Sequence, residues 1–166
     1  MFNKSKSKGM TLIEMMVYVG IISLLLVIVV ETLTTVTRTY RATSATRSIN
    51  VSGMTALERI MRDIRNADSV DQAQSLLDSN PGKLVLLSGG TTTEFYTEGG
   101  LIKVRENGVS RGTLIGGTVT TTSLVFRLVT TPKSSAAKVE MTIEAGSGPN
   151  LRSSNFYGTA VLRNSY

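Results

Sequence analysis

The feature that most constrains this chain is an apolar segment near its N-terminus that begins at Met10 and runs to Val30. As a helix it would be about 31 Å long, at roughly 1.5 Å per residue, which matches a bilayer hydrocarbon core of roughly 30 Å. Glu14 is the only charged residue within it. Because an acid at the bilayer centre costs roughly 2.5–3.5 kcal/mol, a membrane segment that keeps a carboxylate usually needs it for a function.

The residues on either side of this segment indicate how it is used. Three lysines, Lys4, Lys6 and Lys8, precede Gly9. Such a basic flank favours a cytoplasmic N-terminus, with the C-terminal part exported across the membrane. A secretory signal peptide would have a shorter apolar stretch followed by small residues of the A-x-A type, and residues 31–35 offer no such site.

Residues 8–14 read Lys-Gly-Met-Thr-Leu-Ile-Glu, and with the apolar run they resemble the N-terminal signature of type IV prepilins and of the pseudopilins of type II secretion. In that family a short basic leader ends in glycine, which corresponds here to Gly9. The first mature residue, most often Phe, corresponds to Met10, and the family's glutamate corresponds to Glu14. The resemblance implies that a dedicated peptidase cuts after Gly9 and methylates the Met10 amine, and that Glu14 serves in assembly.

The sequence after the membrane run predicts that the helix continues. No proline occurs before Pro81, so nothing forbids a helix from residue 31 to Ala67. Residues 32–48 include seven threonines, which are poor helix formers, and we expect this part to be the softest. Within 54–64, apolar residues at helical spacing predict a stripe that packs on the chain's own C-terminal sheet: Met54, Leu57, Ile60, Met61 and Ile64.

Between Arg38 and Arg65, basic residues dominate the helix beyond the membrane run, and Glu58 and Asp63 oppose them. We favour a solvated face with salt bridges, and contact with lipid headgroups or with acidic neighbours in an assembly is the alternative. We do not expect nucleic acid as a partner, because Tyr40 is the one aromatic residue there, which leaves no stacking platform. The basic residues are Arg38, Arg41, Arg47, Arg59, Arg62 and Arg65.

From residue 83 the sequence becomes typical of antiparallel strands. Short runs rich in β-branched and apolar residues alternate with Gly-Gly, Asn-Gly, Pro-Lys and Gly-rich turns. Asn107-Gly108 is a strong hairpin signal. One long helix followed by such strands predicts an α+β, pilin-like fold in which the helix packs on a C-terminal antiparallel sheet. The expected strands are 83–87, 92–97, 101–106, 123–130, 138–145 and 159–163.

Three further stretches resemble the J-type minor pseudopilin of type II secretion and related minor pilins. They are the helix end at 56–67, the run Ser-Leu-Val-Phe-Arg-Leu at 123–128 and the closing residues 157–164. Many type IV pilins close a C-terminal loop with a disulfide, which this cysteine-free chain cannot form. The missing cysteines therefore favour a pseudopilin or a minor pilin.

The composition also excludes several kinds of chemistry. Without cysteine or histidine the chain has no Cys/His zinc site and no His- or Cys-based catalysis. Asp68, Asp71 and Asp78 could suggest calcium, but their spacing is no EF-hand loop, and we expect a solvated linker. We predict that the protein is not an enzyme and needs no cofactor or metal. Its glycine pairs lack a phosphate-binding context and predict turns: Gly89-Gly90, Gly99-Gly100 and Gly116-Gly117.

These predictions divide the chain into a cleaved leader (1–9), a transmembrane and assembly helix (10–30), a helical continuation (31–67) and a periplasmic β-rich domain (68–166). The resemblance implies a minor pseudopilin, a structural subunit of the periplasmic filament of a type II secretion system. It would first be anchored once in the inner membrane with its N-terminus in the cytoplasm. Its partners would be other pseudopilins or pilins, the prepilin peptidase, the inner-membrane assembly platform and membrane lipid, with no small-molecule substrate. The alternatives are a minor pilin of a type IV pilus used for adhesion, motility or DNA uptake, and a signal-anchored periplasmic domain that never assembles.

Overall fold

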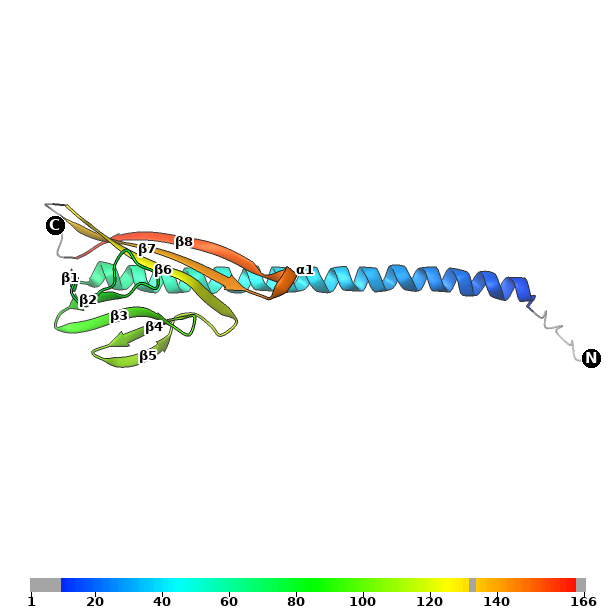
Figure 1. Ribbon diagram of the computed structural model, residues 1–166, viewed down its shortest axis with the longest axis horizontal. Helices are drawn as coiled ribbons and strands as arrows, with labels where there is room; N and C mark the ends of the chain where they lie inside the picture. Colours follow the sequence, from blue (N-terminus) through cyan, green and yellow to red (C-terminus); the bar gives the residue numbers. More distant parts are fainter. Residues whose placement is uncertain (1–9, 132–133, 164–166) are drawn as a thin grey trace, which may run out of the picture. The chain divides into compact units, whose positions relative to one another are not determined.

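The computed structural model describes residues 10–131 and 134–163. They fall into two compact units, one ending at Tyr40 and the other beginning at Arg41, and each is described by itself. Helix α1 (Leu12–Asn66) starts in the first unit and ends in the second, so the predicted long helix is confirmed (Figure 1). The predicted leader, including Gly9, lies outside the described residues.

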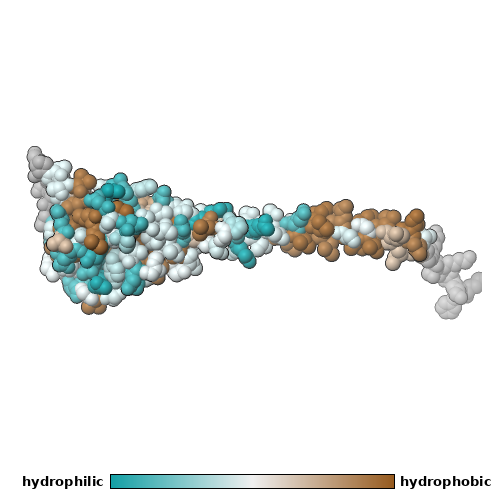
Figure 2. Space-filling view, in the orientation of Figure 1, coloured by the Kyte–Doolittle hydropathy of each residue, from teal (hydrophilic) through white to brown (hydrophobic). Residues whose placement is uncertain are grey.

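The first unit is the N-terminal part of α1, and every residue from 10 to 40 is exposed. Figure 2 shows the apolar part as a continuous hydrophobic surface next to the N-terminal end. The threonine-rich part that follows is helical throughout. Six of its seven threonine hydroxyls are satisfied locally, because each of the six donates to the carbonyl four residues earlier, at 2.8–3.1 Å. These threonines are Thr32, Thr34, Thr35, Thr37, Thr39 and Thr46.

In the second unit, one face of α1 forms the centre of the hydrophobic core. The β-rich part of this unit forms two sheets, one of five strands and one of three. The helix face packs in a single cluster of buried side chains with Phe95 of the five-stranded sheet and with Phe126 and Val139 of the three-stranded one. The three strands of the second sheet run along this helical segment (Figure 1). The buried helical residues recur every three or four positions, as one face of a helix requires: Ala45, Ile49, Gly53, Ala56, Ile60 and Ile64.

The predicted apolar stripe is therefore right in kind but rotated in phase. Ile60, Met61 and Ile64 are buried as expected, whereas Leu57 is half-buried and Met54 is 58% exposed. The small residue Gly53 takes the place expected for Met54. A Cβ added at Gly53 would collide with the ring of Phe156, so glycine leaves the room that this ring occupies against the helix. A pattern of large apolar residues cannot reveal a face that is defined by small ones.

The first sheet is a five-stranded antiparallel meander in the order β1 (Ser69–Val70), β2 (Leu84–Ser88), β3 (Thr91–Glu98), β4 (Leu101–Glu106) and β5 (Val109–Thr113). Two-residue turns with positive φ join β2 to β3, β3 to β4 and β4 to β5. At the last of them Asn107 has φ 50° and Gly108 φ 79°, which confirms the predicted hairpin. The predicted turns at Gly89-Gly90 and Gly99-Gly100 are also confirmed.

The second sheet is a three-stranded antiparallel meander of β6 (Val119–Thr130), β7 (Ser135–Ala145) and β8 (Arg152–Val161). A 3-10 turn (Gly148–Asn150) precedes β8. The register of β7 with β8 is continuous over the whole length of β8, from the Ala136–Val161 pair to the Ala145–Arg152 pair. The inward side chains of β8 alternate with exposed ones.

The α+β fold is confirmed, but several predicted strand boundaries are wrong. The strands form two sheets rather than one, β1 and β5 were not expected, and β8 starts seven residues before the predicted 159–163. All five residues of β5 are exposed, so the segment has no burial alternation to detect. The first half of β8 reads Arg-Ser-Ser-Asn, which has the composition of a loop, and it is a strand because β7 pairs with it.

Candidate processing and assembly site

The start of α1 is closed by a reciprocal pair of hydrogen bonds between Thr11 and Glu14. The Thr11 N–H donates to Glu14 Oε2 at 3.3 Å, and the Glu14 N–H donates to Thr11 Oγ1 at 3.3 Å. This is a capping box, and it satisfies two of the backbone donors that a helix leaves free at its first turn. It also holds the Glu14 carboxylate at the positive end of the helix dipole.

The Thr-x-x-Glu spacing of this capping box stands openly in the sequence, so this role of Thr11 could have been predicted and was not. Met10 lies directly before the cap, outside the helix, and is 59% exposed. Of the three residues that the sequence singles out, the structure therefore places Met10 and Glu14 within one turn of each other. Gly9 lies outside the described residues.

The segment behind the cap has the properties of a membrane anchor. α1 is long and apolar enough to cross a membrane, judged by its length and composition, and none of its apolar stretch is buried within the protein. The core helix of a soluble domain would be mostly buried. The one polar hydroxyl between Val19 and Val30, that of Ser23, donates to the Val19 carbonyl at 2.8 Å, so it adds no free donor to the apolar surface.

Residues 4–30 match the family model described as "Prokaryotic N-terminal methylation motif". The chain carries a prepilin-type methylation motif. The motif supports the type IV prepilin-like superfamily, whose members are structural subunits rather than enzymes, and it indicates a type IV pilin-like protein. The apolar helix behind it fits a signal-anchored membrane protein. No curated protein and no solved structure matches the chain.

The basic helix segment is salt-bridged in one part and free of carboxylates in the other. Arg59 Nε lies 2.8 Å from Asp63 Oδ2, and Arg59 Nη2 lies 3.4 Å from Glu106 Oε1 of β4. Arg62 adds a longer contact of 3.8 Å to Asp63. The salt-bridged face that we favoured is thus present at this end of the helix. Arg47 is exposed, and within the described residues it has no ion pair.

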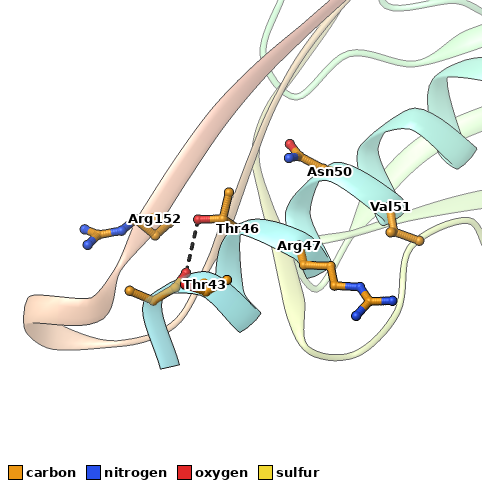
Figure 3. A pocket seen from close by; sticks show the side chains of 7 residues that line it. Thr43, Thr46, Arg47, Asn50, Val51 and Arg152 are labelled. Carbon is orange, nitrogen blue, oxygen red and sulfur yellow. Dashed lines mark hydrogen bonds between the residues drawn. The ribbon is translucent and has the colours of Figure 1, made fainter. Parts of the chain in front are cut away.

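A shallow groove lies between the start of this helical segment and the start of β8 (Figure 3). Thr43, Asn50 and Val51 line its helical side, and Arg152 stands on the other. Arg47 and Arg152 point away from each other, so the two guanidinium groups do not converge on one anion. The groove therefore has the shape of a surface depression rather than that of a headgroup or phosphate site.

The three aspartates that could suggest calcium are all used within the fold. Asp68 accepts from the Gly89 N–H at 2.8 Å, and Asp71 Oδ1 accepts from the Ala73 and Gln74 N–H groups at 3.0 and 3.1 Å. Asp78 pairs with Arg127 at 2.8 Å. Over residues 10–131 and 134–163, no group of three or more acidic residues is placed to hold a metal ion. The segment from Asp68 to Asp78 is held to the fold by hydrogen bonds and an ion pair, so it is more ordered than the solvated linker that we expected.

The outer faces of the two sheets carry ordered charge. On β7, Lys138 Nζ lies 2.6 Å from Glu140 Oε1, and the hydrogen bond from Lys138 holds the pKa of the Glu140 carboxyl below its ordinary value, with Arg127 adding to the effect. On the first sheet, Lys103 holds the pKa of Glu98 low in the same way. These groups are exposed, so their pairs are worth little stability. They do mark which strands present charge to solvent.

Proposed function

We propose that the protein is a minor pseudopilin, a structural subunit of the periplasmic pseudopilus of a type II protein secretion system. The observation that carries this proposal is the methylation motif joined to the capping box. Processing would remove residues 1–9 and leave a methylated amine on Met10. That amine would lie one residue before Thr11. The Thr11 N–H already donates a hydrogen bond to the Glu14 carboxylate.

The Glu14 carboxylate has two ways to act on such an amine. Within one chain, the pair would offset the cost of placing each charge in an apolar environment. Between chains, the carboxylate of one subunit would neutralise the Met10 amine of a neighbour. This ion pair would fix the axial register of the two helices, because their apolar surfaces have few other features that could set it. The second role is the assembly function that the resemblance assigns to this glutamate.

The rest of the chain supports separate roles for the parts of such a subunit. Residues 10–30 would be the membrane and assembly helix, 31–67 its continuation and 68–166 the periplasmic domain. The subunit would sit first in the inner membrane with its N-terminus in the cytoplasm. It would then join other pseudopilins through the assembly platform. The three stretches that resemble the J-type minor pseudopilin favour secretion over a pilus.

Intact-mass analysis of the protein purified from its own membranes tests the processing step. We expect a species that lacks residues 1–9 and carries one methyl group on Met10. Retention of Met1, or a cut beyond Val30, would contradict both the secretion and the pilus assignment. A deletion strain then separates these two, because loss of secreted proteins with normal pili supports the pseudopilin and the reverse supports a minor pilin.

A further inference from the structure

Strand edges are sites of unpaired backbone groups, and among the described residues the edges of the two sheets differ in how they are protected. The outer edge of β6 is covered by the chain that precedes β2. The Gly82 N–H donates to the Leu124 carbonyl at 2.7 Å, and the Asp78 N–H donates to the Phe126 carbonyl at 2.9 Å. Asn80 Oδ1 accepts from the Leu124 N–H at 3.1 Å. The backbone groups of Leu124 and the carbonyl of Phe126 on this edge are therefore already paired within the chain.

The edges of the first sheet are protected in other ways. β1 is only two residues long. β5 is five residues long, carries the charge of Arg111, and contains Gly112 at φ 113°. Its pairing with β4 shifts register between Val104 and Arg105. Short length, charge and a bulge are the usual protections of an edge strand against pairing with another chain.

Between Arg152 and Arg163, the edge of β8 has none of these protections. The strand is ten residues long, contains no proline, and pairs with β7 without a bulge. No charged residue lies between Arg152 and Arg163. The Leu162 N–H donates to the Ser135 carbonyl at 3.0 Å, and the alternation of an antiparallel ladder then turns the N–H and C=O groups of the odd-numbered residues away from β7.

The next odd-numbered residue confirms this direction. The Arg163 N–H donates to the Ala67 carbonyl at the end of the helix, at 3.0 Å, on the side away from β7. Between Arg152 and Arg163, this side of the strand is open along the described chain. The side chains that accompany the open groups are exposed and uncharged, and Tyr157 is the largest at 61% exposed. They are Ser153, Asn155, Tyr157, Thr159 and Val161.

We infer that the β8 edge receives an extended segment of another polypeptide as an added strand, and that this segment is uncharged in the middle and acidic at both ends. The backbone groups of the odd-numbered residues would supply its hydrogen bonds. The acidic ends follow from charge complementarity, because Arg152 and Arg163 are exposed at the two ends of the open edge. Among the described residues neither arginine is paired with a carboxylate.

The same charges disfavour a second copy of this chain as the occupant. A full-length antiparallel pair of two β8 strands would be centred on Tyr157. It would place Arg152 of one copy opposite Leu162 of the other, and therefore beside its Arg163. Because no acidic residue lies between Arg152 and Arg163, a second copy would offer neither arginine a carboxylate along the ladder. The inference rests on the second unit alone and stands apart from the processing of Met10.

The decisive experiment compares two substitutions at one position of the full-length chain in its own membranes. Thr159→Pro removes an outward N–H without touching a β7 hydrogen bond, and edge strands tolerate such a proline. Thr159→Ala keeps the N–H and loses the same hydroxyl. With a photo-crosslinking amino acid in place of Asn155, we expect a crosslink to another protein that persists in the alanine variant and falls about tenfold or more in the proline variant. The crosslinked peptide should be an extended segment bounded by acidic residues.

Two further variants fix the nature of the occupant. Arg152→Glu combined with Arg163→Glu should abolish the crosslink, whereas Arg65→Glu, on the exposed face of the helix end, should not. Because the chain has no cysteine, Tyr157→Cys reports self-pairing without background. A disulfide-linked dimer of this chain would overturn the inference in favour of a second copy. Equal crosslinking in the proline and alanine variants, with equal melting temperatures, would overturn the added strand itself.

Discussion

At the scale of single residues, Glu14 combines a hydrogen-bonding role with an electrostatic one. Its carboxylate accepts a hydrogen bond from the Thr11 N–H within the capping box, and in the processed subunit that we propose its charge would be available to the Met10 amine. The two roles can be separated by chemistry. Glu14→Gln keeps an acceptor oxygen at the same place and removes the charge, while Thr11→Val removes the capping hydroxyl and keeps the charge.

We therefore expect the two variants to behave differently in assembly. Glu14→Gln should still insert and be cut after Gly9, but its crosslinking to partner subunits should fall about tenfold or more, since a charged group left unpaired in an apolar site is costly. Thr11→Val should stay within about twofold of the parent, because a lost cap costs only about 1 kcal/mol. Glu14→Leu, which removes both roles, serves as the control for complete loss. If Glu14→Gln assembles like the parent, the carboxylate is only a helix cap.

Gly53 shows why some decisive residues escape sequence analysis. Its importance lies in what it lacks, since a Cβ at this position would collide with the Phe156 ring. Nothing in the local pattern distinguishes it from Gly20, where the same added atom would meet nothing within 4 Å. By contrast, a helix of membrane-spanning length could be predicted, because bilayer thickness acts on length and composition alone.

At the scale of elements, the orientation of α1 in the second unit sets what each helical side chain does. Ile60 is fully buried in the core, and Met54 is exposed. Ile60→Asp should therefore cost about 3 kcal/mol or more, which would lower the melting temperature by about 10 °C. Met54→Asp, the matched control with the same new charge, should change stability by less than about 0.5 kcal/mol. Thermal unfolding followed by circular dichroism measures both. Similar losses in the two variants would mean that the helix is rotated from the orientation described.

The strands show which elements the alternation of apolar and polar residues can predict and which it cannot. β4 and β7 were predicted close to their observed positions because their burial alternates with a period of two. β5 has no buried residue, and the first half of β8 is polar, so neither carries that signal. These two strands exist because a neighbouring strand supplies their hydrogen bonds, which is information held elsewhere in the chain. The open edge of β8 could not be inferred before the strand itself was found.

At the scale of the whole molecule, the two units differ in what they leave exposed. In the first, the apolar side chains of residues 12–30 are all exposed. The proposed function assigns this surface to contact with lipid or with a neighbouring helix. In the second, helix and sheets share one buried cluster. The unit beginning at Arg41 thus contains its own core, which is the condition for folding independently.

A fragment that starts near Thr34 should consequently be soluble, monomeric and of mixed α/β content by circular dichroism. It retains the whole buried cluster and loses only exposed apolar surface, so we expect a single cooperative melting transition. The full-length chain is the control, and it should require detergent. Analytical ultracentrifugation distinguishes the outcomes. An aggregated or molten fragment would show that the second unit depends on residues before Thr34. A stable dimer that the Tyr157→Cys variant links by a disulfide would show that β8 pairs with itself, and this would count against an acidic partner strand as well.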